Sequence, residues 1–392
     1  MLRLFKDIEL FAPGRCGRVD LLMGGGQILE IADAIRIPKA HCEVRPCHGL
    51  LAVPGFIDGH VHLLGGGGEG GYATRTPEFP ILDAILGGVT TVVGCLGTDG
   101  ITRSLPALLA KTRQLEAEGI SAYMLTGHYG VPTRTFTGSV EEDLLLIDKV
   151  IGVGEVALAD HRSSQPTFAE LARLAAEARR GGMLAGKAGI VNFHLGDGPG
   201  RLELLERLVR ETELPYSQFL PTHVNRSEAL FEAATAYALA GGWVDLTTST
   251  MPWLLELGEI KAARGLRRLM EAGVPARRIT FTSDGQGSLP DFDSEGRLRG
   301  LAVGRVTSLF QEARSAVLEE GLELASALEV ITTSPADLLG LGGKGRLQPG
   351  ADADLVLLKP GTLAIDTVVA RGRILMAAGR PLVQGAFPQE RG

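Results

Sequence analysis

Short apolar runs of strand length alternate with longer stretches of helical periodicity through the middle of the chain. Most of the helical stretches end at glycine, which favours a helix C-terminus, as in Phe168–Arg180 followed by Gly181 and Gly182. This alternation predicts an α/β fold, a (β/α)8 barrel over residues 51–349, rather than an open doubly wound sheet. The predicted strands are Leu50–Ile57, Thr90–Gly94, Ala122–Thr126, Val150–Ala157, Gly189–Leu195, Phe219–Thr222, Trp243–Thr248 and Arg278–Ser283.

The two ends of the chain carry only short apolar runs, without a helical stretch of useful length. Three consecutive glycines, Gly24 to Gly26, mark a hairpin turn between two of these runs. Because chain termini often lie close together, residues 1–50 and 350–392 are predicted to form one small β-sandwich domain beside the barrel. The runs are Leu2–Phe5, Val19–Met23, Gln27–Ile31, Asp354–Leu358, Thr367–Ala370 and Arg373–Met376.

The composition of the 392-residue chain limits which classes of partner and which cellular compartment are expected. Hydrophobic residues make up 45% of it, which suits a large core. The formal net charge of −7 argues against nucleic acid or an anionic membrane as the main partner. No apolar run reaches the roughly 20 residues of a membrane-spanning helix, and the charged start lacks a signal-peptide core. The four cysteines form no CxxC pair and are predicted to be buried free thiols in the cytoplasm.

Two histidines, His60 and His62, follow the first predicted strand. Residues i and i+2 of a strand point to the same face, so both imidazoles are expected to face one spot. A single histidine at a strand end is more often a rim or core residue than a ligand. Here further candidates follow at other strand ends, where a parallel barrel gathers its functional side chains. They are Glu155, His194, His223 and Asp284.

Four histidines and two carboxylates suit two divalent metal ions that share a bridging hydroxide. Histidine-rich ligation favours Zn²⁺. Asp284 is the natural proton acceptor, because it lies at a strand end and Gly285 leaves room beside it. The glycine run from Gly65 to Gly71 is neither a dinucleotide fingerprint nor a phosphate-binding loop, since no regular helix start and no Lys-Ser/Thr pair follow it.

The stretches PGFIDGHVH (54–62) and SDG (283–285), within a barrel flanked by β-rich ends, resemble the amidohydrolase superfamily. Four further stretches make the chain similar to the isoaspartyl (β-aspartyl) dipeptidase family of that superfamily. They are HVHLLGGGGEGG (60–71), LTGHYGVPTRT (125–135), DHRSS (160–164) and PTHVNR (221–226). The resemblance implies a homo-oligomeric enzyme that hydrolyses the isopeptide bond of β-aspartyl dipeptides.

The resemblance also assigns roles to individual residues. It implies that His60, His62 and Asp284 bind one metal ion, that His194 and His223 bind the other, and that a carboxylate on the fourth strand bridges them. Glu69 is expected to bind the α-amino group of the substrate, and Tyr129 to polarise the scissile carbonyl. The residues expected to bind the rest of the substrate are Arg162, Arg226 and Ser288. These types make chemical sense, because planar guanidinium groups suit carboxylates and an ammonium group needs a carboxylate.

One position departs from the family pattern. The bridging ligand of the family is usually a carboxylated lysine, whereas this chain has Glu155 in a run that is one residue longer up to Asp160. The nearest lysine, Lys149, precedes the strand. Glu155 is therefore predicted to bridge the two metal ions as an unmodified carboxylate.

Two other functions stay open. One is a different amidohydrolase, either a cyclic-amide hydrolase or an N-acyl-amino-acid deacylase, whose substrates do not need Glu69, Tyr129, Arg162 and Arg226 together. The other is a non-catalytic scaffold on the same barrel. Such a scaffold is expected to lose metal ligands, and this chain keeps its histidines and Asp284.

Overall fold

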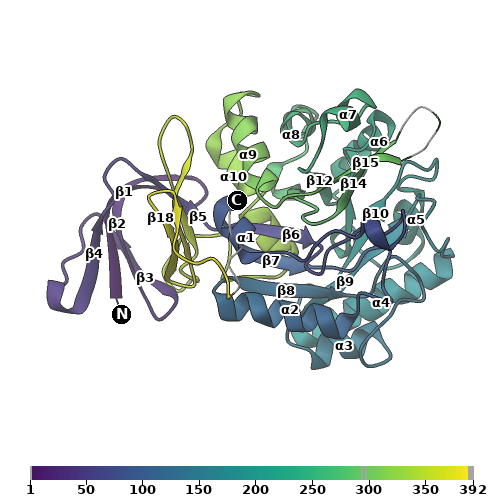
Figure 1. The fold of residues 1–392 in the computed structure, drawn as a ribbon, viewed down its shortest axis with the longest axis horizontal. Coiled ribbons are helices and arrows are strands. Elements are labelled where there is room, and N and C mark those ends of the chain that lie inside the picture. Colours follow the sequence, from purple (N-terminus) through teal and green to yellow (C-terminus); the bar gives the residue numbers. More distant parts are fainter. Residues whose placement is uncertain (1, 293–294, 296–297, 387–392) are drawn as a thin grey trace.

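The computed structural model describes residues 2–292, 295 and 298–386. Met1 and residues 387–392, which belong to the predicted terminal domain, lie outside the described residues. Figure 1 shows a β-rich lobe built from both ends of the chain beside a larger lobe of parallel strands surrounded by helices. Within the described residues, no helix combines the length and the apolar character needed to span a membrane.

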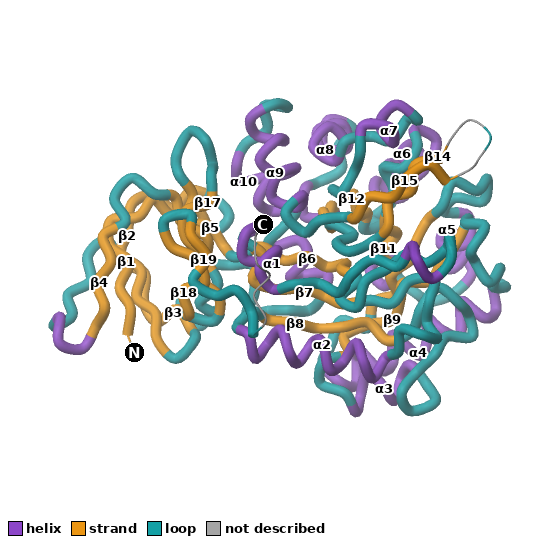
Figure 2. The backbone as a smooth tube through the Cα atoms, in the orientation of Figure 1, coloured by secondary structure: helices purple, strands orange, loops and turns teal. Residues whose placement is uncertain are grey.

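The two ends of the chain pair in one sheet. Among the described residues this sheet has nine strands in the order β19-β18-β17-β16-β5-β1-β2-β3, with β4 on β1. The central join is the antiparallel pairing of β5 with β16. Figure 2 shows β5 in the same lobe as β17, β18 and β19 of the C-terminal end. The strands are β1 (Leu2–Phe11), β2 (Arg15–Gly24), β3 (Gln27–Ala32), β4 (Cys42–Pro46), β5 (Leu51–Pro54), β16 (Leu355–Leu358), β17 (Ile365–Ala370), β18 (Arg373–Ala377) and β19 (Arg380–Pro381).

The larger lobe contains a parallel sheet of six strands in sequence order and a further parallel pair, β12 and β13. Backbone hydrogen bonds close both gaps between the two sets: Val224 N–H donates to Asp245 O (3.2 Å) and His62 N–H to Gly285 O (2.8 Å). The predicted barrel-type α/β arrangement is therefore confirmed. The strands are β6 (Phe56–Val61), β7 (Val89–Gly94), β8 (Ser121–Thr126), β9 (Val150–Leu158), β10 (Ile190–Leu195), β11 (Phe219–Thr222), β12 (Val244–Thr247) and β13 (Ile279–Thr282).

Helices lie outside these strands, and their buried faces join the main core. Burial of the apolar strand and helix faces supplies the main stabilisation of this lobe. A hairpin, β14 (Ser288–Phe292) and β15 (Leu298–Val303), follows the last barrel strand. The helices are α1 (Ile81–Gly87), α2 (Leu105–Glu118), α3 (Val140–Leu146), α4 (Phe168–Ala185), α5 (Glu203–Glu211), α6 (Glu228–Leu239), α7 (Pro252–Glu256), α8 (Ala262–Glu271), α9 (Ser308–Leu318), α10 (Leu324–Glu329) and α11 (Thr333–Leu338).

Three expectations about local structure were wrong. The predicted strand Leu50–Ile57 is two strands in different sheets, β5 and β6, which part at Gly55 where a Cβ atom would lie 2.3 Å from Thr90 Oγ1. The helix predicted to end before Gly181 continues to Ala185, because Gly181 and Gly182 let it approach α3 and Gly189 closely. Cys16 is exposed, whereas the other three cysteines are buried free thiols as expected.

Candidate metal centre and substrate pocket

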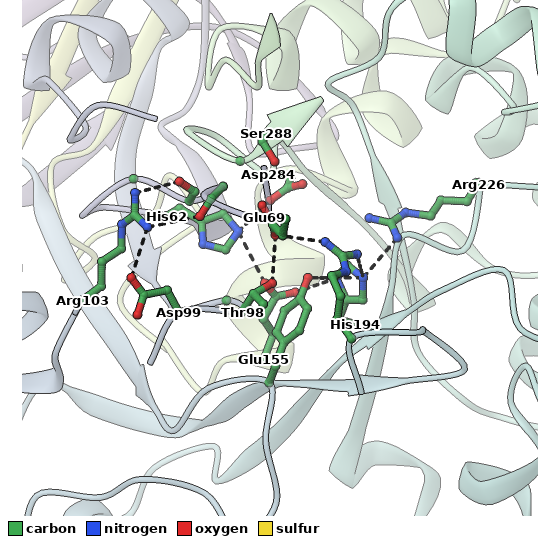
Figure 3. A pocket seen from close by; sticks show the side chains of 17 residues that line it. His62, Glu69, Thr98, Asp99, Arg103, Glu155, His194, Arg226, Asp284 and Ser288 are labelled. Carbon is green, nitrogen blue, oxygen red and sulfur yellow. Dashed lines mark hydrogen bonds and ion pairs between the residues drawn. The ribbon is translucent and has the colours of Figure 1, made fainter. Parts of the chain in front are cut away.

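Six predicted metal ligands come together at the carboxyl ends of the barrel strands. His60 lies in β6, Glu155 in β9 and His194 in β10, whereas the other three follow the ends of β6, β11 and β13. All six are buried. The structure therefore gathers His60, His62, Glu155, His194, His223 and Asp284 in one place. Four of them, His62, Glu155, His194 and Asp284, line the pocket in Figure 3.

The distances between ligand atoms fit a metal centre. His60 Nε2 and His62 Nε2 each lie 3.4 Å from a Glu155 oxygen, and His62 Nε2 lies 3.0 Å from Asp284 Oδ1. His194 Nδ1 lies 3.1 Å and His223 Nε2 3.5 Å from Glu155 Oε2. Two donors each about 2.0–2.1 Å from a tetrahedral zinc ion lie roughly 3.3–3.4 Å apart, so this spacing matches a shared cation.

Several atoms of this cluster lack a hydrogen-bond partner. Among the described residues, His60 Nδ1 and Nε2, Glu155 Oε1 and Asp284 Oδ1 are buried without one. A buried polar atom without a partner costs free energy, and a bound cation removes that cost. The donor set and its unpaired atoms therefore fit divalent metal ions.

Glu155 belongs to both groups of side chains that could hold a metal. One group is His60, His62, Cys95 and Glu155, and the other is Glu155, His194 and His223. Asp284 lies beside the first group, 3.7 Å from His60 Nε2. This shared position is the one expected for a bridging carboxylate.

A β-bulge places Glu155 in the cluster. Val153 pairs with Val191 and Val156 with Phe193, so β9 has one more residue than β10 between these pairs. The irregularity in β9 therefore lies at Gly154 and Glu155. A bulge bends its strand and re-aims a side chain, which is how the shorter glutamate reaches the other ligands.

The electrostatics keep both carboxylates ionised. Burial would raise the pKa of Glu155, but His60 and His194 outweigh it and hold the pKa well below its usual range. Burial is likewise outweighed at Asp284, whose pKa is lowered by His62 and His223. Burial, with Arg226 nearby, lowers the pKa of His223 to about 3, so its imidazole is neutral at pH 7, the form that binds a metal ion.

The predicted substrate-binding residues line the same pocket. They are Glu69, Tyr129, Arg162, Arg226 and Ser288. Glu69 Oε1 accepts hydrogen bonds from Thr98 Oγ1 (2.9 Å) and Arg162 Nη1 (3.2 Å). Arg226 Nη1 donates to Leu195 O (3.3 Å), and Figure 3 shows its guanidinium group directed towards His194. Ser288, at the start of β14, lines the pocket as well and is labelled in Figure 3.

Tyr129 lies between the metal-ligand cluster and the predicted substrate-binding residues. Its hydroxyl oxygen is 2.7 Å from His194 Nδ1, and the guanidinium carbon of Arg162 lies 5.3 Å from its ring centroid. Burial, together with the charge of Glu155, raises the pKa of Tyr129 well above its usual value. The phenol therefore keeps its proton and can donate a hydrogen bond.

Sequence reasoning missed several residues that hold this site. Thr247 Oγ1 lies 2.6 Å from His223 Nδ1, and Cys95 Sγ lies 3.9 Å from His62 Nδ1. Buried Arg103 donates to the carbonyl oxygens of Leu64 (3.1 Å) and Gly66 (2.7 Å) in the glycine loop. Asp160 contacts both Arg162 and His194. Only Asp160 carried a sequence signal, because it stands two residues before an arginine of the quoted DHRSS stretch.

A model of the amidohydrolase family matches residues 51–376, and the chain therefore belongs to that family of hydrolases. The structure of the β-aspartyl dipeptidase of Fervidobacterium islandicum AW-1 in complex with β-Asp-Leu dipeptide is 45% identical, with a TM-score of 0.91, and the match covers 97% of this chain and 98% of that one. A second structure of β-aspartyl dipeptidase from that organism is 43% identical, with a TM-score of 0.89 and the same coverage. The resemblance to the isoaspartyl dipeptidases is thus confirmed.

More distant relatives share the fold. A D-hydantoinase structure is 19% identical with a TM-score of 0.68, covering 99% of this chain and 98% of that one. Among curated proteins, the dihydroorotase of Lactiplantibacillus plantarum is 24% identical over 403 residues, covering 91% of this chain and 89% of the relative. The D-hydantoinase match agrees with the barrel-type fold observed here.

Proposed function

We propose that this chain is a metal-dependent dipeptidase that hydrolyses the isopeptide bond of β-aspartyl dipeptides. One observation carries the proposal: a carboxylate (Glu69) and two guanidinium groups (Arg162 and Arg226) face one pocket beside the buried metal-ligand cluster. Such a dipeptide carries one ammonium group and two carboxylates around its isopeptide bond. The β-Asp-Leu complex of the similar dipeptidase supports this substrate class.

The pocket groups would bind the substrate by charge. Glu69 binds the free α-amino group, and the two arginines bind the carboxylates with paired hydrogen bonds. Ser288 contacts the aspartyl end. A cyclic amide or an N-acyl amino acid lacks this set of charges, so the pocket favours a β-aspartyl dipeptide over both.

The proposed cofactor is a pair of divalent metal ions, Zn²⁺ by the chemistry of the ligands. His60, His62 and Asp284 would hold one ion, His194 and His223 the other, and Glu155 both. When bound, two such ions lower the pKa of a water molecule and polarise a carbonyl group.

The residues of the chain would then move the proton. Asp284 accepts a proton from the attacking water and returns it to the leaving amine as the isopeptide C–N bond breaks, which yields aspartate and the second amino acid. Tyr129 donates a hydrogen bond to the scissile carbonyl oxygen as negative charge develops on it.

The role of Glu69 can be tested with an acetylated substrate. N-acetyl-β-Asp-Leu lacks the ammonium group, so the partly exposed Glu69 keeps its bonds from Thr98 and Arg162 but loses its charged substrate partner, which costs about 1 kcal/mol. We expect kcat/KM to fall accordingly relative to β-Asp-Leu. In the Glu69→Gln variant the difference between the two substrates should shrink. Equal turnover of both by the unchanged protein would contradict this role.

The molecular organisation is also proposed. Residues 1–50 and 350–392 would form the small β-sandwich domain, with residues 51–349 as the catalytic barrel. The observed split at Gly55 assigns β5 to the sheet of the terminal segments, so the boundary would fall a few residues later. A homo-oligomeric assembly and a cytoplasmic location stay predictions.

A further inference from the structure

The carboxylate of Asp160 lies between the metal-ligand cluster and the substrate pocket. Asp160 stands two residues beyond the end of β9, and its side chain is only 4% exposed. Oδ1 accepts hydrogen bonds from the backbone N–H (2.8 Å) and Nε (2.9 Å) of Arg162, and Oδ2 accepts one from its Nη2 (2.7 Å). The same Oδ2 lies 3.0 Å from His194 Nε2.

These bonds use one edge of the Arg162 guanidinium group. The Nε and Nη2 edge is held by Asp160, whereas Nη1 points into the pocket, 3.2 Å from Glu69 Oε1. The group also lies over the ring of Tyr129. A guanidinium held on one edge still offers N–H donors on the other, so Arg162 can bind a substrate carboxylate without first being ordered.

The second contact of Asp160, with His194, lies on the side of the metal-ligand cluster. His194 Nδ1 faces Glu155, so Nε2 must carry the ring proton when Nδ1 binds a metal ion. Arg162 Nη2 and Arg226 Nη1 lie 3.1 Å from Nε2, but both are donors as well. Asp160 is the acceptor among these groups, and a carboxylate that accepts from a metal-bound histidine fixes its orientation and raises its affinity for the metal.

We propose that Asp160 is a positioning residue that couples the two halves of the site, because it holds His194 for the metal ion and Arg162 for a substrate carboxylate. The substrate half rests on the proposed function. The metal half depends only on His194 as a ligand.

Two measurements on the zinc-loaded protein test the coupling. Zinc affinity is measured by competition with a chromophoric chelator, and KM and kcat with β-Asp-Leu and its two mono-carboxamide analogues. The Asp160→Asn variant keeps the shape of the side chain but weakens its acceptance from both partners. We expect it to bind zinc about tenfold more weakly or worse and to raise KM for β-Asp-Leu by a similar factor.

The Arg162→Met variant separates the two halves. It should raise KM for β-Asp-Leu and leave zinc affinity unchanged, because Asp160 still holds His194. The Arg162→Met variant also shows which carboxamide analogue does not depend on Arg162, because its KM for that analogue should equal that of the unchanged protein. With that analogue as substrate, Asp160→Asn should not raise KM above the value of the unchanged protein. The matched control is Asp148→Asn, which breaks a surface pair with Arg113 and should change neither quantity.

Several results would overturn the coupling. One is wild-type zinc affinity in Asp160→Asn; another is an equal rise of KM for all three substrates. If Asp160→Asn does not fold, Arg162→Met still decides, since a matching loss of zinc there would show that Arg162 holds His194. If the unchanged protein does not turn over β-Asp-Leu, the proposed function fails, and zinc affinity alone still tests the hold on His194.

Discussion

Glu155 is the residue on which the proposed metal centre would depend most. Its oxygens lie within 3.1–3.5 Å of nitrogen atoms on all four histidines, and the side chain is fully buried. A glutamate carries its carboxylate already, whereas a lysine must first react with carbon dioxide to become a carboxylated lysine. We therefore expect metal-free protein to regain full activity with zinc in buffer stripped of carbon dioxide. A requirement for bicarbonate would contradict this and point to a modified lysine.

The Glu155→Gln variant tests the same residue by metal content. A neutral amide is a poorer ligand between two cations than a carboxylate, so occupancy of at least one metal site should fall. The measurement is the zinc content per chain after gel filtration. Lys187 is the matched control position, because it is the lysine expected to be carboxylated if the metal centre used a modified lysine instead of Glu155. Its Nζ donates instead to the carbonyl oxygens of Leu144 and Ile147 (both 2.6 Å), so Lys187→Met should keep the zinc. Two zinc ions in Glu155→Gln would contradict the bridging role.

At the scale of the residue, the sequence predicted which side chains come together at the site better than it predicted the residues that contact them. His60, His62, His194, His223 and Asp284 stand at strand ends, and a parallel barrel brings strand ends together. Thr247, Cys95 and Arg103 carry no such signal, since their contacts with the site depend on how distant strands and loops pack.

At the scale of the element, the bulge in β9 decides where Glu155 points. Gly154 occupies it, and a Cβ atom there would lie 2.8 Å from Asn192 O on the neighbouring strand. We expect Gly154→Ala to lower the free energy of unfolding by about 1–3 kcal/mol and to weaken zinc binding, because Glu155 is displaced. Urea denaturation and chelator competition measure the two effects.

The control for this variant is Gly200→Ala, where nothing lies within 4 Å of the added atom. It should stay within about 0.5 kcal/mol of the unchanged protein. If Gly154→Ala matches the control in stability and zinc affinity, the bulge does not position Glu155.

Elements were predicted well where one apolar run forms one whole strand, and poorly where the close packing of glycine decided the structure. The strand predicted at Phe219–Thr222 has those bounds in the structure. In contrast, Gly55 separates one apolar run into strands of two sheets, and Gly181 and Gly182 lie inside a helix rather than at its end. Glycine in a sequence does not distinguish a turn from a close approach, because both need the missing Cβ atom.

At the scale of the whole molecule, a buried lysine links the barrel to the terminal sheet. Lys344 Nζ donates to Ser121 Oγ in β8 (2.7 Å) and to Oδ2 of Asp354, one residue before β16 (2.6 Å). Lys344→Met leaves the buried Asp354 without its cationic partner and, among the described residues, with only the backbone N–H of Arg371 as donor, so we expect the free energy of unfolding to fall by about 3–5 kcal/mol. The exposed Lys359→Met is the control, within about 0.5 kcal/mol. Equal denaturation midpoints of the two variants would contradict this link.

The most direct test of the proposed function is a comparison of three substrates by the zinc-loaded protein. Turnover of β-Asp-Leu is measured beside α-Asp-Leu and a cyclic imide under the same conditions. We predict rapid hydrolysis of β-Asp-Leu and little of the other two, because only β-Asp-Leu carries an ammonium group and a carboxylate on the same carbon, one methylene away from the scissile carbonyl. Preferred hydrolysis of the cyclic imide, or equal hydrolysis of the two dipeptides, would contradict the account.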